Sequence, residues 1–250
     1  MDIAVIYGQN HKGNTWALTK LFLDRFRECG ARVTEFFLPD GQIGYCTGCT
    51  SCIMKGERSC PHFPAVQAIV AAIDGADLII VSSPTYAMGM TGQLKTLFDH
   101  LAYRFMSHRP DPSMFRKQAL AVSTAAGAGM GRTTKAIADN LFWWGAARTY
   151  RCGLRIASPD FGHIPAKRMK KIERRADRIA RKITSGRQRA RAGIKTRFIF
   201  SFMRLGQKHN DWNPVDKEHW QNLGWLGKSR PFCPLFRTLT NCTQRRKNIQ

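Results

Sequence analysis

Short apolar runs alternate with amphipathic helical patterns along the first 160 residues, and this alternation limits the possible folds more than any other feature. The strand-like runs cover residues 3–7, 33–37, 78–82, 119–123 and 149–156, and helical patterns cover residues 14–29, 66–73, 92–104 and 132–144. Strands separated by helices predict parallel strands joined by right-handed crossovers. We therefore expect a doubly wound α/β domain with a five-stranded parallel sheet.

Length and composition agree with one such domain carrying an extension. The chain has 250 residues, of which 43% are hydrophobic, so a disordered chain is excluded. Its apolar runs are far shorter than the ~18 to 20 residues that span a bilayer, which predicts no transmembrane helix. Residues 1–7 enter a strand-like run directly and leave no room for a signal segment. We expect a cytoplasmic protein with reduced thiols.

Positive charge is concentrated in the C-terminal third. Residues 1–165 contain 17 basic and 12 acidic residues, whereas residues 166–250 contain 23 basic and 5 acidic residues. Charge boundaries of this kind often mark an added interaction segment. The expected division is an α/β domain over residues 1–187, including its last helix, and a basic, aromatic-rich extension over residues 188–250.

Three patterns in the C-terminal third have structural implications. Residues 167–187 follow a helical pattern with one apolar face, which favours a last helix that packs on the sheet. Residues 198–203 are apolar and lie between arginines, so they pack over the domain or a partner subunit, or lie in an anionic membrane interface. Asn213 and Pro214 resemble the start of a further helix.

Three loops that follow predicted strands are the expected ligand site, because ligands bind at the carboxyl ends of strands in such sheets. Loop 8–15 lacks the dinucleotide and Walker fingerprints, but Gly13, Asn14 and Thr15 at a helix start suit a phosphate group. A plain turn with an Asn or Thr cap is the alternative. Loop 82–92 suits a flat ring, and loop 124–131 has almost no side chains beyond Cβ.

Together these loops resemble the flavodoxin-like NADPH-dependent FMN reductase family. The matching segments are residues 4–8 with 12–15, residues 76–86, and residues 90–95 with Phe98 and Asp99. The resemblance covers about residues 1 to 155 and implies a flavodoxin-like fold, bound FMN, and NAD(P)H as an electron donor. It also implies a homodimer.

The resemblance also implies which residues hold FMN. The phosphate residues would be Gln9, His11, Gly13, Asn14 and Thr15, and the ring residues would be Pro84, Thr85, Tyr86, Ala87, Met88 and Gly89, with Thr124 and Gly127 from the third loop. The first loop departs from the usual pattern of the family, because Gln9 stands where a hydroxyl side chain is common. Gln9 and His11 can still donate hydrogen bonds.

Four cysteines form the sharpest local motif. Cys46, Cys49, Cys52 and Cys60 have the spacing C-x2-C-x2-C-x7-C and are followed by a proline. This compact spacing favours a 4Fe-4S cluster over zinc, which prefers two separated pairs, and it resembles the iron-sulfur flavoproteins. Redox-active thiols are the alternative, and their pKa would then have to be lowered by helix ends or by Lys55 and Arg58.

Two functions follow from these patterns. The first is an FMN-dependent oxidoreductase that passes electrons from NAD(P)H, or from a reduced ferredoxin-like carrier, through the flavin to an unidentified acceptor. The second is a basic binding protein that engages nucleic acid or an anionic membrane through its extension. No hydrolytic triad or pair of carboxylates stands out in the sequence.

Overall fold

A computed structural model shows one parallel sheet of five strands within the described residues, which are 1–39, 43–186 and 190–232. The strands are β1 (Asp2–Tyr7), β2 (Arg32–Phe37), β3 (Leu78–Ser82), β4 (Gln118–Ala125) and β5 (Arg148–Arg155), and they lie in the order β2-β1-β3-β4-β5. In register, Ile3 pairs with both Val33 and Leu78. The order reverses at β1 and β3, where doubly wound sheets bind ligands. The predicted fold class is confirmed.

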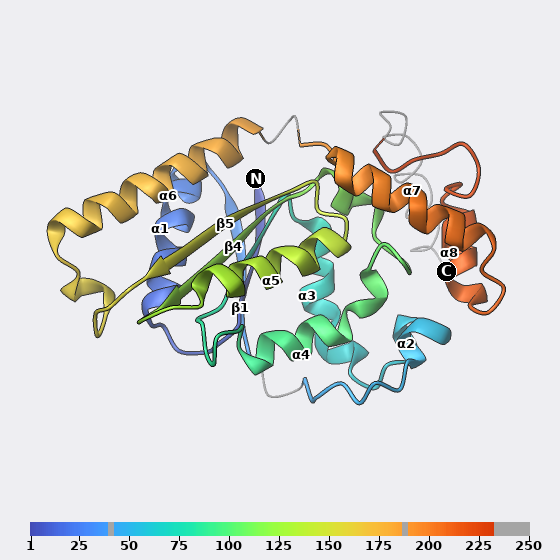
Figure 1. The fold of residues 1–250 in the computed structure, drawn as a ribbon, viewed down its shortest axis with the longest axis horizontal. Helices are drawn as coiled ribbons and strands as arrows, with labels where there is room; N and C mark the ends of the chain where they lie inside the picture. The colour runs from blue at the N-terminus through green and yellow to red at the C-terminus, as the bar shows by residue number, and fades with distance from the viewer. Residues whose placement is uncertain (40–42, 187–189, 233–250) are drawn as a thin grey trace.

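The three central strands, β1, β3 and β4, are buried on both faces because helices cover the two sides of the sheet (Figure 1). On one side, α1 (Asn14–Glu28) and α6 (Ala166–Gly186) pack against alternate residues such as Val5 and Ile80. On the other side, α3 (Phe63–Gly75), α4 (Gly92–His100) and α5 (Met130–Trp143) pack against the intervening residues, such as Ile6 and Val81. Two apolar cores therefore enclose the sheet.

Helix α6 packs on the sheet over residues 166–186, and residue 187, the last of the expected helix, lies outside the described residues. Its apolar positions Ile172, Ala176 and Ile183 are buried in the same core as Leu18 and Phe22 of α1. Many basic side chains of α6 are exposed instead. The remaining short elements are α2 (Ser51–Met54) and the 3-10 helices η1 (Glu57–Ser59), η2 (Ala102–Arg104), η3 (Pro112–Arg116) and η4 (Phe161–His163).

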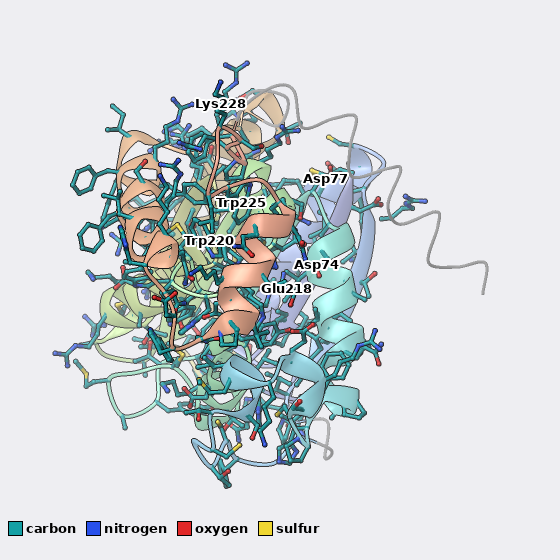
Figure 2. All side chains as sticks on the ribbon, turned by 90° about the vertical axis from the view of Figure 1, so that its right-hand side faces the viewer. Asp74, Asp77, Glu218, Trp220, Trp225 and Lys228 are labelled. Carbon is teal, nitrogen blue, oxygen red and sulfur yellow. The ribbon has the colours of Figure 1, made fainter. Side chains whose placement is uncertain are left out.

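The described part of the extension, residues 190–232, contains two helices that pack on the α/β domain, α7 (Ile194–Lys208) and α8 (Pro214–Asn222). Phe200, Trp220 and Trp225 form a third apolar core with Met106 and Phe115 of the domain. Figure 2 shows Trp220 and Trp225 directed from α8 and the turn after it toward the rest of the molecule. The predicted start of α8 is confirmed, since the Asn213 side chain accepts a hydrogen bond from the Asp216 amide. No helix among the described residues is both long and apolar enough to cross a bilayer.

Candidate functional site

A cavity of about 490 Å³ opens at the carboxyl ends of β1, β3, β4 and β5. Its walls come from four loops that are distant in sequence. The lining residues are Gln9, His11, Gly13, Asn14, Thr15, Pro84, Thr85, Tyr86, Thr124, Ala125, Ala126, Ile156, Ser158 and Pro159. The expected site at the carboxyl edge is thus an actual cavity.

The first loop is held at its start by a close contact between Gly8 and Thr91. Thr91 Oγ1 donates to the Gly8 carbonyl at 2.6 Å, and a Cβ on Gly8 would lie only 2.6 Å from the same Thr91 oxygen. Any larger residue at position 8 would therefore push the first loop away from Thr91, the residue before α4. This contact fixes where the loop leaves β1.

The start of α1 has free backbone donors. Gly13 is the residue before the helix and no side chain caps the first turn, so the capping alternative for Asn14 or Thr15 is wrong. Asn14 Nδ2 instead donates to the Ser158 carbonyl at 3.2 Å. Within the described residues, Asn14 Oδ1 is buried without a hydrogen-bond partner. The first-turn N–H groups of a helix attract an anion when no side chain uses them.

Hydroxyl groups connect the loops under the cavity. Thr15 Oγ1 lies 2.6 Å from Thr124 Oγ1, which joins the start of α1 to the end of β4. Thr85 Oγ1 lies 3.0 Å from Ser123 Oγ and 2.9 Å from Thr133 Oγ1, which joins the second loop to β4 and α5. These bonds between distant segments hold the walls in one arrangement.

The second loop is a tight turn. Tyr86 and Gly89 exchange backbone hydrogen bonds of 3.0 and 2.9 Å, and Ala87 and Met88 between them have positive φ angles of 47° and 64°. Tyr86 Oη donates to Gln9 Oε1 at 3.0 Å, so the second loop is tied to the first. The Tyr86 side chain is half exposed at the rim of the cavity.

Most of the predicted flavin residues meet at this cavity, but some do not. Ala87, Met88, Gly89 and Gly127 are absent from its lining. The structure adds residues that the sequence reading missed, namely Ala125, Ala126, Ile156, Ser158 and Pro159. Their position in the sequence could have predicted them, because they lie at or directly after the ends of β4 and β5, at the same edge of the sheet.

The electrostatics of the cavity are unusual for a site that suits a phosphate. Among the described residues, no lysine or arginine lines it, and His11 is the lining side chain that can become a cation. An anion here would depend mainly on backbone and side-chain N–H donors, together with the positive end of α1.

The cysteine segment lies elsewhere, beside α8 rather than at the tips of β4 and β5 (Figure 1). Cys46 and Cys49 are exposed, Cys52 and Cys60 are partly buried, and all four are free thiols. Cys60 Sγ lies 3.7 Å from His100 Nδ1, while His100 Nε2 lies 2.7 Å from the Gly44 carbonyl oxygen.

The thiols of this segment differ in acidity. Burial raises the pKa of Cys52, and the nearby thiol groups of Cys60 and Cys46 raise it further. Hydrogen bonds with the side chain and the backbone of Ser51, the first residue of α2, lower the pKa of Cys49. Of the two expected causes, this is the helix end and not Lys55 or Arg58. Among the described residues, no group of three or more His, Cys, Asp or Glu side chains is arranged to hold a metal ion.

Comparison with known proteins gives matches in sequence and in structure. The sequence model of the NADPH-dependent FMN reductase family matches residues 1–153. An iron-sulfur flavoprotein of Archaeoglobus fulgidus is 23% identical over 236 residues, which cover 90% of this chain and 100% of the relative. An iron-sulfur flavoprotein of Methanocaldococcus jannaschii is 36% identical over 88 residues, or 35% of this chain and 45% of the relative.

Solved structures share the fold. An azoreductase of Bacillus anthracis aligns with a TM-score of 0.54 at 16% identity, covering 73% of this chain and 100% of the other. An NADH:FMN oxidoreductase aligns with a TM-score of 0.51 at 18% identity, covering 78% of this chain and 92% of the other. At these identities the comparison establishes the architecture alone.

Proposed function

The chain belongs to the NADPH-dependent FMN reductase family, and from this premise we propose that it binds FMN in the cavity at the carboxyl edge of the sheet. It is a flavin-dependent oxidoreductase that takes electrons from NAD(P)H. We further propose that an acceptor still to be identified receives these electrons from the flavin.

The uncapped start of α1 is the observation that carries the FMN assignment. The free amides of the first turn lie in one part of the cavity wall, beside Asn14 and Thr15. Amide donors at a helix start suit the phosphate of FMN. Gln9, His11 and Thr15 complete this proposed phosphate region, and Gln9 is already oriented by its bonds to His11 and Tyr86.

The rest of the cavity suits a flat ring. Pro84, Thr85 and Tyr86 on one loop and Ala125 and Ala126 on another leave mainly backbone groups and small side chains in the wall. Backbone amides and carbonyls can hold the polar edge of a planar ring, and an aromatic side chain can pack on its face. The donors and the size of the side chains therefore fit FMN.

FMN, when bound, supplies the chemistry of hydride and electron transfer. The residues of this chain bind and orient it. The hydroxyl bonds between Thr15 and Thr124 and between Thr85 and Thr133 keep the walls from moving apart. A wall fixed before binding lowers the entropic cost of ordering the loops when the ligand binds.

We propose separately that the cysteine segment binds a 4Fe-4S cluster, a proposal that rests on the spacing of Cys46, Cys49, Cys52 and Cys60. Relatives carry the name iron-sulfur flavoprotein, but the four thiols of this chain form no metal-holding group in the described arrangement. Iron and acid-labile sulfide analysis of anaerobically purified protein tests this directly. About four irons and four sulfides per chain, lost in a Cys49→Ala variant, would support the 4Fe-4S cluster.

Anaerobic absorption spectroscopy tests the proposed function. The purified protein, reconstituted with FMN, should show flavin bands that bleach on addition of NADPH or NADH. Comparing the two nucleotides at equal concentration identifies the donor. If the protein takes up no FMN, the cavity assignment is wrong. If bound FMN is bleached by dithionite but by neither nucleotide, a reduced ferredoxin-like carrier becomes the donor.

We also propose a homodimer formed near the flavin edge, as the family resemblance implies. Sedimentation of the FMN-loaded protein measures its mass, and a monomer at micromolar concentration would contradict this proposal.

A further inference from the structure

Helix α7 presents a second apolar face to the outside of the molecule. Its inward face buries Thr196, Phe200 and Gln207. Four large apolar side chains lie on the opposite face at steps of four, four and three residues, namely Ile194, Phe198, Phe202 and Leu205, and they are 89%, 70%, 62% and 55% exposed. We call these four residues the α7 stripe. Such spacing places them in one row along the helix.

The α7 stripe makes no part of the third core. Phe200 fills that core from the inward face, where it stacks on Trp220 with ring centroids 4.8 Å apart. In Figure 2 the pale orange helix α7 lies at the outer edge of the molecule beside α8, with side chains directed away from the body. Core packing therefore does not explain the choice of large apolar residues in the stripe.

Positive charge surrounds the stripe. From residue 178 to residue 210 the sequence contains ten Lys or Arg and no Asp or Glu. Lys195, Arg197 and Lys208 on α7 are exposed. Trp212, just beyond the helix, is 64% exposed as well. Tryptophan is enriched where a membrane meets water, and an apolar helix face flanked by cations is typical of helices that lie in that interface.

We propose that the α7 stripe docks on the surface of an anionic membrane, a property beyond the flavin chemistry. The apolar side chains enter the boundary between headgroups and acyl chains, while Lys195, Arg197 and Lys208 remain near anionic headgroups. Figure 1 shows α7 at the opposite end of the molecule from the tips of β4 and β5. Docking through α7 thus leaves the cavity open to nucleotide and acceptor.

The charge around the α7 stripe favours an anionic lipid surface over a second copy of the chain or a nucleic acid. A second copy docked stripe to stripe would bring two segments rich in cations and free of carboxylates together, which is repulsive. Nucleic acid would attract the cations but would place the four apolar side chains against phosphates. An anionic bilayer offers negative charge at its surface and an apolar phase directly beneath.

Vesicle co-sedimentation of the full-length, FMN-loaded protein tests the proposal. We expect binding to phosphatidylcholine vesicles that contain phosphatidylglycerol and at least about tenfold weaker binding to phosphatidylcholine alone. The double variant F198S/F202S should lose at least about tenfold in binding to the anionic vesicles. Tyr45→Ser is the matched control, because Tyr45 is another exposed aromatic residue, 83% exposed and outside α7. It should bind as the unaltered protein does.

Several results would overturn the proposal. The proposal is wrong if the unaltered protein does not bind to anionic vesicles. It is also wrong if F198S/F202S binds to them as tightly as the unaltered protein, because charge alone would then explain the binding. A fall in sedimentation mass from dimer to monomer in F198S/F202S would assign the stripe to a second copy. Circular dichroism and flavin content confirm that the variant is folded, and I194S/L205S provides the same test from the two ends of the stripe.

Discussion

Arg109 and Asp216 form a buried ion pair that joins the α/β domain to the extension. The two side chains are 6% and 0% exposed. The same guanidinium donates to the carbonyl of Ile53 at 3.0 Å and to the carbonyl of Cys52. Arg109, which lies in the segment after η2, therefore contacts both the start of α8 and the cysteine segment.

Asp216 is fully satisfied at this junction. His108 Nδ1 and Asn213 Nδ2 lie 2.7 and 2.9 Å from its Oδ2 atom, while Arg109 takes Oδ1. Asn213 Nδ2 also lies 3.4 Å from the Ile53 carbonyl. The extension thus helps to fix the backbone that carries Cys52, a role that its basic composition does not suggest.

Removing one member of the Arg109–Asp216 pair should destabilise the protein strongly. We expect Arg109→Met to lower the free energy of unfolding by about 3 to 5 kcal/mol, because it leaves a buried carboxylate without its main counterion. Urea unfolding measures this. The double variant R109M/D216L should lose less than the sum of the two single variants, and strict additivity would show that the pair is not coupled.

Replacing donors at the start of α1 should weaken FMN binding. The variant N14A/T15A should raise the dissociation constant of FMN by about ten- to a hundredfold, since a hydrogen bond to a charged group is worth about 1.5 to 3 kcal/mol. Quenching of FMN fluorescence gives the constant. Lys20→Ala on the outer part of the same helix, where Lys20 pairs with Asp24, should change it little. Unchanged flavin content in N14A/T15A would show that the side chains of Asn14 and Thr15 do not hold the phosphate.

The extension should unfold together with the α/β domain. Phe200 is fully buried between Trp220 and Phe115, so Phe200→Ala should cost about 3 to 5 kcal/mol. Phe198→Ala, on the exposed face of the same helix, should cost under about 1 kcal/mol. Far-ultraviolet circular dichroism and tryptophan fluorescence should report one shared transition. An earlier, separate fluorescence transition would instead make residues 188–250 a domain of their own.

Stability should fall at alkaline pH partly through Cys152. Burial raises the pKa of this β5 thiol to about 11, whereas in the unfolded chain a cysteine has a pKa of about 8.5. The unfolded state therefore loses its proton first, and stability that is present below pH ~8.5 is lost as pH rises toward 11.

The effect of Cys152 can be isolated by comparing two proteins. Between pH 8 and pH 10.5 in the presence of reductant, the unaltered protein should lose on the order of 2 kcal/mol more than Cys152→Ala, as measured by urea unfolding. Other titrating groups, such as Tyr7, act in both proteins and cancel. Equal losses would show that the Cys152 thiol ionises normally in the fold.

Local patterns were sufficient for the α/β domain. Alternating apolar runs located β1 to β5, and three-to-four-residue spacing located α1, α5 and α6. This was possible because the hydrophobic periodicity of a strand or helix can be recognised from residues close together in the sequence. The carboxyl-edge rule then brought Asn14, Thr85 and Thr124 to one cavity. The Cys-x2-Cys-x2-Cys spacing likewise marked the segment that contacts α8, although not its thiol geometry.

The sequence by itself determined the five strands, the helices of the α/β domain and the edge of the sheet at which we expect a ligand, but it did not predict α7. Tertiary structure alone decided that Ser158 joins the cavity and that Arg109 meets Asp216, because those contacts join residues more than 100 positions apart. It also decided which side of α7 is buried. Apolar residues occupy two faces of that helix, so periodicity could not choose between them, and the choice depended on Trp220 and Trp225 packing around Phe200.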